Sequence, residues 1–330
     1  MKNRRGVALL TALWLVVAIA VVVLDFSLEA KERRQLGLDA AERGVARAAA
    51  SGALAIVQGK LDYALRTAPQ GNGAAALRAA DPWLGVDSVY SGVYDVDSIH
   101  VDVRARDLGT QVNVNNLTQE ELRTFFGFVL GDFETADKLS QSITDWRDAD
   151  DIPRARGAEK DDYVKAGLLT LPQNGPFREV EDLLQVMYMT PEIYAAVSPY
   201  FTTRGEGFVN LNTAPAPVLR VLPGMTDALL GQIIALRSSG RRIASVAQVM
   251  AASQRGRPGL GGAAGQAAQA AQQAAQQAAT QRLQQRASVD TREVELTMIA
   301  RANPSAQPSR LIVIISRAAP TLASIEWKQW

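Results

Sequence analysis

The most constraining feature of this sequence is an apolar segment close to its N-terminus. Residues 7–24 have only apolar side chains apart from Thr11, and a helix of this length just reaches across a lipid bilayer. Lysine and arginine residues precede the segment, and Asp25 follows it. By the positive-inside rule, the N-terminus stays in the cytoplasm and the rest of the chain is exported. A secretory signal peptide has the same basic start, but no convincing small-x-small cleavage site follows the segment.

Helical character continues well beyond the apolar segment. Residues 31–47 are charged and helix-favouring, and no proline interrupts the chain before Pro69. An unbroken helix from Val7 to about Leu65 would be roughly 90 Å long, because each residue adds about 1.5 Å. The sequence thus predicts a helix that is half membrane anchor and half stalk. Small residues would make one face of the stalk narrow enough to pack closely on a head: Gly37, Gly44, Ala48, Ala49, Ala50, Gly52, Ala53, Ala55 and Gly59.

Composition excludes several classes of protein. The 330 residues include no cysteine and one histidine, so disulfide scaffolds, thiol catalysis and multi-histidine metal sites are ruled out, and any bound metal should have oxygen ligands. Lysine and arginine number 35 against 34 aspartate and glutamate, a balance that does not favour nucleic acid. No phosphate-binding loop or Gly-x-Ser-x-Gly motif is present. The lone His100 lies in a strand pattern beside Asp102, where we expect a structural role, and we expect no enzymatic activity.

The junction between the basic leader and the apolar segment reads Arg4-Arg5-Gly6-Val7. A short basic leader that ends in glycine before a long apolar helix resembles the start of type IV prepilins. The resemblance implies cleavage after Gly6 by a prepilin peptidase and N-methylation of Val7. Prepilins usually carry glutamate at the fifth mature position, where it pairs with a neighbouring subunit's N-terminal amine, because a lone carboxylate in lipid is costly. Here that position is Thr11, and a subunit without the glutamate fits the tip of a filament. In this departure the sequence resembles the K-type minor pseudopilins of type II secretion.

Two separated parts of the chain show the alternation of half-buried strands. The first part, residues 86–114, contains short alternating stretches at 89–90, 92–94 and 99–103. The second part contains three more predicted strands, at 294–300, 311–316 and 322–327. Because the intervening residues are mostly helical in pattern, we predict an α+β fold. The long N-terminal helix packs on an antiparallel sheet, and a large α-helical domain is inserted between its strands, as in K-type pseudopilins.

This interpretation divides the chain into six segments. They are a prepilin leader (1–6), a transmembrane segment (7–24), the stalk helix with the first part of the sheet domain (25–112), the inserted helical domain (113–253) with an acidic loop (145–176), a Gly/Ala/Gln-rich linker (254–288) and the remaining strands (289–330). The composition of the linker predicts a connection without an apolar face.

The predicted insertion contains an internal repeat. The sequence Val-Asn-Val-Asn-Asn at 112–116 matches Val-Asn-Leu-Asn-Thr at 209–213, and similar helical stretches follow, ending at Arg147 and Arg237. Each unit reads as helix, tight turn, helix and a further helix. The turns are predicted at two dipeptides that contain glycine, Phe126-Gly127 and Pro223-Gly224.

The Leu-Pro-Gly turn at 222–224 resembles a helix-hairpin-helix motif, which in DNA-repair proteins binds the phosphate backbone through amides of the turn. Three observations oppose this use. Met225-Thr226 replaces the usual Gly-x-Gly continuation, no lysine or arginine follows closely, and residues 113–255 carry a net charge of −4. Phosphate binding needs positive counter-charge, so a hairpin used for packing is the favoured interpretation. A membrane-anchored protein for DNA binding and uptake is the alternative function.

The first repeat unit carries an acidic loop that the second lacks. Twenty-nine residues separate Arg147 from Phe177, whereas five separate Arg237 from Ile243. Repulsion among the many carboxylates of this loop calls for a cation, and calcium suits irregularly spaced oxygen ligands because its coordination is flexible. Alternatively, the loop is solvated and partly neutralised by its own basic residues, which are Arg147, Arg154, Arg156 and Lys160.

The pattern Asp145-Trp146-x-Asp148-x-Asp150, followed by Gly157-Ala158-Glu159-x-Asp161-Asp162-Tyr163, resembles the calcium-binding loop of K-type pseudopilins. The resemblance implies a structural calcium ion, and the family also allows a second one. The implied ligands are six carboxylates and one backbone carbonyl, from Asp148, Asp150, Asp151, Ile152, Glu159, Asp161 and Asp162.

These features together predict a non-enzymatic assembly protein. The resemblance implies a minor pseudopilin at the tip of the type II secretion pseudopilus, which primes assembly and supports export of folded proteins from the periplasm through the outer membrane. Implied partners are the I- and J-type minor pseudopilins, other pseudopilins, the prepilin peptidase and exported substrates, without nucleic acid. The implied location is the inner membrane, crossed once, with a cytoplasmic N-terminus and a periplasmic head. A minor pilin of a type IV pilus is a further alternative.

Overall fold

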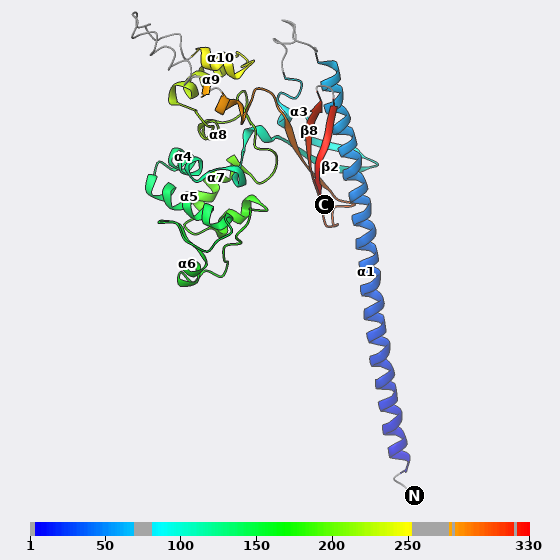
Figure 1. The fold of residues 1–330 in the computed structure, drawn as a ribbon. Helices are drawn as coiled ribbons and strands as arrows, with labels where there is room; N and C mark the ends of the chain where they lie inside the picture. Colours follow the sequence, from blue (N-terminus) through cyan, green and yellow to red (C-terminus); the bar gives the residue numbers. More distant parts are fainter. Residues whose placement is uncertain (1–3, 69–80, 253–276, 279–280, 320–321) are drawn as a thin grey trace, which may run out of the picture.

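The dominant element of the computed structural model is a single helix, α1 (Arg4–Thr67), of 64 residues. The structure describes residues 4–68, 81–252, 277–278, 281–319 and 322–330. One end of α1 lies against the head, and the other end projects far beyond it (Figure 1). The prediction of one continuous helix from the apolar segment to about Leu65 is therefore confirmed.

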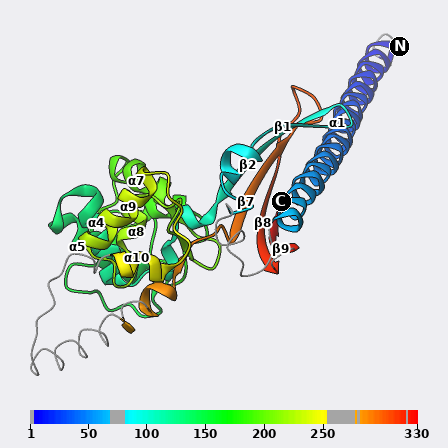
Figure 2. The same cartoon turned by 90° about the horizontal axis from the view of Figure 1, so that it is seen from above.

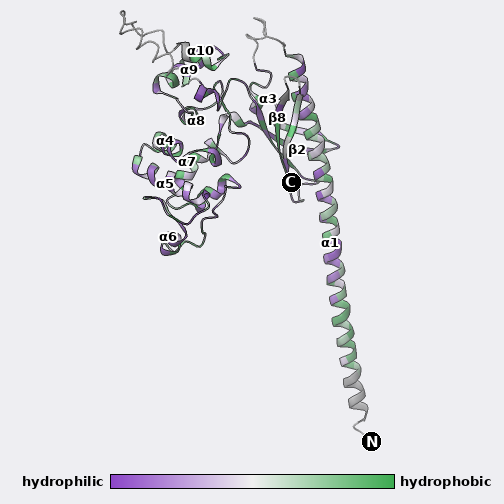
Figure 3. Ribbon diagram, in the orientation of Figure 1, coloured by the Kyte–Doolittle hydropathy of each residue, from purple (hydrophilic) through white to green (hydrophobic). Residues whose placement is uncertain are grey.

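The projecting part of α1 has the composition of an anchor followed by a stalk. It contains a window of mean hydropathy 2.2, none of which is buried, so the helix is long and apolar enough to cross a membrane. Figure 3 shows this hydrophobic stretch toward the N-terminus and more hydrophilic residues between it and the head.

The head contains an antiparallel sheet of five strands in the order β1-β2-β7-β8-β9. The strands are β1 (Gly92–Val96), β2 (Ile99–Asp107), β7 (Glu293–Ala300), β8 (Ser309–Ala319) and β9 (Leu322–Gln329). The fold class and these strands are as predicted, with one exception. Residues 89–90 do not form a strand: Val89 ends the short helix α3 (Val86–Val89) and Tyr90 is its C-cap. The helix begins after Gly85, which has the left-handed conformation with φ of 74°.

Small side chains make the closest contact between α1 and the sheet. Gly52 lies so near β1 that a Cβ atom there would be 2.7 Å from the Val96 side chain. In contrast, Gly37, Gly44 and Gly59 would have no neighbour within 4 Å of an added Cβ. The prediction that all four glycines line the packed face was therefore wrong. Residues three or four apart share a helix face, and the face of α1 that packs on the sheet consists mainly of other residues. They are the buried Ala46, Ala49, Ala50, Ala53, Leu54, Val57, Leu61 and Leu65.

A helical insertion separates β2 from β7 and lies on the side of the sheet away from α1 (Figure 2). Its helices are α4 (Gln119–Leu130), α5 (Phe133–Arg147), α6 (Lys160–Lys165), α7 (Pro191–Val197), α8 (Ala216–Arg220), α9 (Asp227–Ser238) and α10 (Val246–Ala252). Among the described residues, segments of 3₁₀ helix accompany them, namely η1 (Leu108–Thr110), η2 (Val114–Asn116), η3 (Val180–Gln185) and η4 (Ser198–Tyr200).

Two short parallel ladders close the repeat units of the insertion. Strand β3 (Val112–Asn113) pairs with β4 (Phe201–Thr202), and β5 (Val209–Asn210) pairs with β6 (Ala287–Ser288). Strand β6 and the buried Leu283 fall within the predicted linker, so its last residues belong to the insertion instead. Residues 253–276 and 279–280 of that region lie outside the described residues.

The internal repeat appears as two copies of one hydrogen-bonding arrangement. Asn115 donates from Nδ2 to the Phe177 carbonyl at 2.9 Å and accepts the Phe177 N–H at 2.8 Å. Asn212 makes the same pair of bonds with Ile243, at 3.0 and 2.9 Å. Each asparagine thus ties the start of its unit to the segment that follows the second helix. We call these two arrangements the asparagine clasps.

The hairpin turn of the second unit lies at Gly224, as predicted, with φ of 83°. The turn predicted at Phe126-Gly127 was wrong, because Gly127 lies inside α4. The first hairpin turns at Gly131, with φ of 69°, and Asp132 then caps α5 by accepting two backbone N–H groups. Helix α4 has 12 residues, whereas its counterpart α8 has five, so an alignment of the units without a gap displaces the turn.

The sheet and the insertion have separate hydrophobic cores, and polar contacts at the end of β2 join them. Asp107, 2% exposed, accepts hydrogen bonds at Oδ2 from Asn210, Thr213 and Thr291. Burial raises the pKa of this carboxyl, and its hydrogen bonds oppose that rise.

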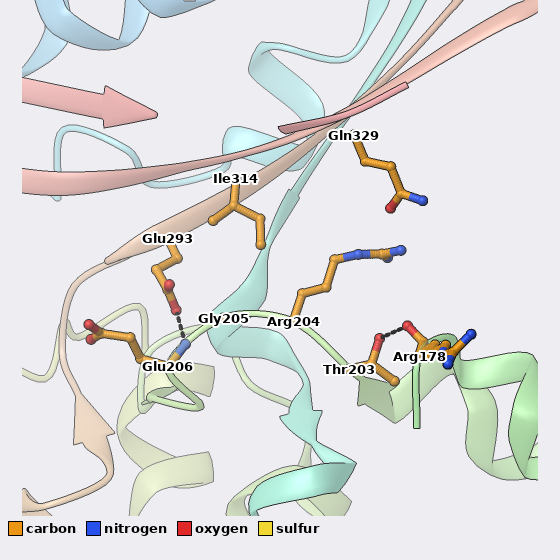
Figure 4. Close-up of a pocket in the computed structure, with 8 residues that line it drawn as sticks. All are labelled: Arg178, Thr203, Arg204, Gly205, Glu206, Glu293, Ile314 and Gln329. Carbon is orange, nitrogen blue, oxygen red and sulfur yellow. Dashed lines mark hydrogen bonds between the residues drawn. The ribbon is translucent and has the colours of Figure 1, made fainter. Parts of the chain in front are cut away.

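Beside this joint, a cavity of about 400 Å³ separates the insertion from the sheet (Figure 4). Arg204 reaches across from the insertion and pairs with Glu179 and with Glu295 of β7. The Glu206 N–H donates to Glu293. Charged groups therefore fix the insertion to the outer face of the sheet.

Candidate metal centre

The acidic loop brings three of the predicted ligand carboxylates together. Asp148 caps the end of α5, Asp150 follows it in the loop, and Glu159 directly precedes α6. Each offers a carboxylate oxygen, and these oxygens all lie within 4.8 Å of one another. We call these three residues the carboxylate cluster.

The carboxylate cluster is only partly satisfied by the protein. Glu159 is 2% exposed, and among the described residues neither of its carboxylate oxygens, nor Oδ1 of Asp148, has a hydrogen-bond partner. Burial of unpaired carboxylates is costly. Loss of hydration, together with the nearby charges of Asp145 and Asp148, raises the pKa of Glu159 to about 7. The arrangement therefore favours a bound cation.

Arg154 lies at one side of the cluster and holds it to the end of α5. Its Nη1 is 2.5 Å from an oxygen of Asp148 and 2.5 Å from an oxygen of the fully buried Asp145. The Arg154 N–H also donates to Asp145, at 3.2 Å. Gly157 packs directly on this pair, since a Cβ atom there would lie 1.8 Å from Asp145 Oδ2. The loop is thus built around a buried aspartate and a glycine that makes room for it.

The other basic residues of the loop do not neutralise the cluster. Arg147 points the other way and donates to the carbonyls of Val114 and Leu117, and Arg156 pairs with Asp137. Within the described residues, Lys160 forms no ion pair. The interpretation of a loop neutralised by four basic residues therefore holds for Arg154 alone.

The remaining predicted ligands lie around the cluster rather than in it. Asp151 accepts a hydrogen bond from Asn174, and the N–H of Ile152 donates to Asp150. Asp162 accepts the Glu159 N–H at the start of α6, and Asp161 is exposed on the first turn of that helix. The structure therefore brings Asp148, Asp150 and Glu159 together and leaves these four residues with other contacts or with solvent.

An aromatic cluster anchors the acidic loop to the core of the insertion. Trp146 stacks on Phe177, with ring centres 5.9 Å apart and planes 6° apart, and also packs against Tyr163. Phe177 is the residue held by the Asn115 clasp, and Tyr163 lies in α6. A cation in the carboxylate cluster would join the end of α5 to the start of α6, the elements that carry Trp146 and Tyr163, so its role would be structural.

His100 and the turn at 222–224, both discussed from the sequence, have structural contacts among the described residues. His100 is exposed and pairs with Asp95 across β1 and β2. At the turn at 222–224, Leu222 is buried, and its carbonyl accepts the Met225 N–H at 3.0 Å. Arg220, just before the turn, pairs with Asp227. The turn therefore serves packing.

The long apolar helix, the antiparallel sheet beside its inner end and the helical insertion between strands define a pilin-like protein with a split head. No curated protein matches this chain in sequence. Residues 107–205 match the sequence profile of the family described as type II secretion system (T2SS), protein K. These residues are therefore a domain of the protein K family, which confirms the resemblance inferred from the sequence.

A solved structure has a similar fold over most of the chain. It is a chain of the crystal structure of the GspK-GspI-GspJ complex from the type 2 secretion system of enterotoxigenic Escherichia coli. The two share 16% sequence identity, and the match covers 91% of this chain and 98% of that chain with a TM-score of 0.54.

Proposed function

We propose that this chain is a minor pseudopilin of type II secretion with a structural, non-enzymatic role. The observation that carries the proposal is the protein K domain at residues 107–205, inserted into a sheet that packs on a 64-residue helix with a free apolar end. A chain with this combination is suited to be a subunit of the type II secretion pseudopilus.

The sequence at the start of α1 supports a place at the tip of the pseudopilus. A prepilin peptidase cleaves after Gly6 and methylates Val7, and the mature helix then holds the subunit in the inner membrane with its head in the periplasm. With Thr11 in place of glutamate, no lipid-buried carboxylate needs an amine from a subunit above. The subunit then primes assembly and supports export of folded proteins through the outer membrane.

The proposed partners are the I- and J-type minor pseudopilins. This proposal is supported by the similar fold of a chain in the GspK-GspI-GspJ complex and by the exposed apolar side chains on the projecting part of α1, which include Trp14, Phe26 and Leu36. A helix with apolar residues on its exposed surface is suited to packing against the helices of neighbouring subunits.

We also propose that the carboxylate cluster binds one calcium ion. Its donors are all oxygens, its spacing is irregular, and three buried oxygens have no hydrogen-bond partner among the described residues. These features suit the flexible coordination of calcium better than the strict octahedron of magnesium. The ion would supply positive charge to the cluster and cross-link the end of α5 to the start of α6. Asp148, Asp150 and Glu159 would hold it.

The test of the proposed function is co-purification. The full chain, produced in detergent with the I- and J-type subunits of the same secretion system, should form a stable complex with them. Mass spectrometry of the mature chain should find methylated Val7 as its first residue. A chain that neither associates with these subunits nor begins at Val7 would refute the proposal, and salt-sensitive DNA binding would favour the DNA-uptake alternative.

A further inference from the structure

A groove of about 560 Å³ lies at the end of the sheet from which α1 leaves the head. It runs between β1, β2 and the turn that joins β7 to β8. Its apolar surface includes Val93, 67% exposed, and the partly exposed Ile299. The turn is fixed to α1, because Asn303 Nδ2 donates to Glu42 Oε1 at 2.8 Å. The groove therefore opens beside the point where the stalk becomes exposed.

Arginine side chains gather on the same face of the sheet. Strand register sets Arg104 of β2 opposite Thr297 on β7 and sets Arg310 of β8 opposite Ile299 on β7, so these two arginines lie on either side of β7. Four of them are exposed on this face: Arg104, Arg106, Arg301 and Arg310.

The protein itself balances little of this positive charge. Arg104 is 3.9 Å from Asp102, and both side chains are largely exposed, so this pair is weak. Asp95 is occupied by His100. Within the part of the chain that the structure describes, no ion pair is found for the other three arginines. In the register Arg106 lies opposite Glu295, which pairs with Arg204. Like charges on one face of a sheet repel one another, and a ligand of opposite charge would offset that repulsion.

We propose that this groove and its arginines bind an acidic surface of a second pseudopilin that stands beside α1. The inference rests on the proposed function and adds to it the face of the head that is used and the chemistry of the partner. An apolar floor with a charged rim is the usual anatomy of a protein interface, in which arginine is enriched. Electrostatic complementarity of this kind selects the partner and fixes its register.

The position of the groove along α1 favours a protein over the membrane as its ligand. Glu42 follows Leu24, the last residue of the predicted transmembrane segment, by 18 positions, which corresponds to about 27 Å along an upright helix. Charges in physiological salt are screened over about 8 Å. Lipid phosphates therefore lie too far below the groove to neutralise it, whereas a protein domain standing beside the stalk occupies that height.

A zero-length cross-linker tests the contact directly. A carbodiimide joins lysine amines to carboxylates and leaves arginine unreacted, so Arg104→Lys and Arg301→Lys make the groove reactive without changing its charge. In the full chain co-purified with the I- and J-type subunits, each variant should give a covalent bond from the new lysine to an aspartate or glutamate of a partner. The matched control is Arg241→Lys, an exposed position in the turn after α9, which should give no such bond.

Charge reversal tests the energetic importance of the groove. Arg104→Glu combined with Arg301→Glu should weaken association with the partners by about tenfold or more, because like charges across an interface are strongly unfavourable. Arg241→Glu should leave association unchanged. Both variants should keep the thermal midpoint of the unmodified chain, which separates a lost contact from a lost fold.

The outcomes distinguish this inference from the proposed function. If the unmodified chain fails to associate with the I- and J-type subunits, both fall. If it associates, and the groove variants neither cross-link nor weaken the complex, only the groove proposal falls. Cross-links confined to a second copy of this chain would also overturn it. The proposal would also be overturned if nanodiscs of phosphatidylglycerol, without any partner protein, protected the groove lysines from chemical acetylation.

Discussion

Gly157→Ala should destabilise the acidic loop far more than an alanine substitution usually does. The new Cβ atom would lie 1.8 Å from Asp145 Oδ2 and 2.8 Å from its Cγ, distances at which either the loop or the carboxylate must move. Asp145 is fully buried and holds Arg154 through Nη1 at 2.5 Å and the backbone N–H at 3.2 Å. A displaced Asp145 therefore loses its counter-charge without gaining water.

The size of the effect follows from these contacts. Removal of one partner from a buried ion pair costs about 3–5 kcal/mol, but Gly157→Ala displaces the pair instead of deleting it, and Arg154 is 34% exposed. We therefore expect a loss of about 2–3 kcal/mol in the free energy of unfolding, since hydrogen bonds to charged groups contribute about 1.5–3 kcal/mol. For a domain of this size, the thermal midpoint would fall by roughly 4–12 °C.

The assay is thermal unfolding of the full chain in detergent, followed by near-UV circular dichroism, with Gly59→Ala as the matched control. Gly59 lies in α1 with no atom within 4 Å of an added Cβ. Alanine there should leave the midpoint unchanged or raise it, because alanine favours a helix interior by up to about 1 kcal/mol. A midpoint for Gly157→Ala within about 1 °C of the unmodified chain, less than the shift expected for 1 kcal/mol, would show that the Asp145–Arg154 pair does not fix the loop.

The asparagine clasps should differ in strength. Asn212→Ala loses three hydrogen bonds, including one of 2.7 Å to the Val289 carbonyl, and should lower the free energy of unfolding by about 2–3 kcal/mol. Asn115→Ala should lower it less. Equal losses for the two variants in urea titrations would contradict this order. Calcium at one hundred times its dissociation constant should stabilise the chain by about 2.7 kcal/mol. In differential scanning fluorimetry, the double variant Asp148→Asn with Glu159→Gln should lose the stabilisation by calcium, whereas Asp161→Asn should keep it. Undiminished stabilisation of the double variant by calcium would exclude this cluster as the site. In EDTA the double variant should be at least as stable as the unmodified chain, because repulsion between unpaired carboxylates is removed. Because burial raises the folded pKa of Asp107, the folded state binds its proton more tightly than the unfolded state does, so its contribution to stability is greatest at acid pH and declines as pH rises from its ordinary value through the raised one. The stability difference between the unmodified chain and Asp107→Asn, measured in urea, should therefore shrink over that range, and a constant difference would contradict the assignment.

The sequence predicted the elements whose signal is local and periodic. The helix α1 followed from an apolar run, charged helix-favouring residues and the lack of proline up to Pro69. The strands followed from alternation, and the repeat from two nearly identical asparagine-containing stretches. The predictions were wrong where tertiary contacts determine the local structure or the burial of a residue. Val89 joins a helical turn because Gly85 supplies a left-handed start, and only Gly52 of the four stalk glycines meets the sheet.

The candidate metal centre was predicted in outline but not in its internal contacts. Carboxylate density identified the loop, and three of its residues do converge. Sequence spacing could not show that Asp145 is buried beneath them, that Arg154 bridges it to Asp148, or that Asn174 binds Asp151. These contacts depend on how 29 loop residues fold back on α5, and no period in the sequence encodes that path.

The strand order of the sheet determines which parts of the head can fold first during synthesis. Asp107 of β2 is in register with Val294 of β7, so the whole insertion must be synthesised before the sheet can close. Pairings between distant segments form slowly, whereas contacts such as those of α4 with α5 are local. We therefore expect the insertion to fold first and to bring its two ends together. Until β7 is synthesised, β2 would expose an unpaired edge. Strand β7 therefore covers that edge and provides the edge on which β8 pairs, and β9 then pairs with β8.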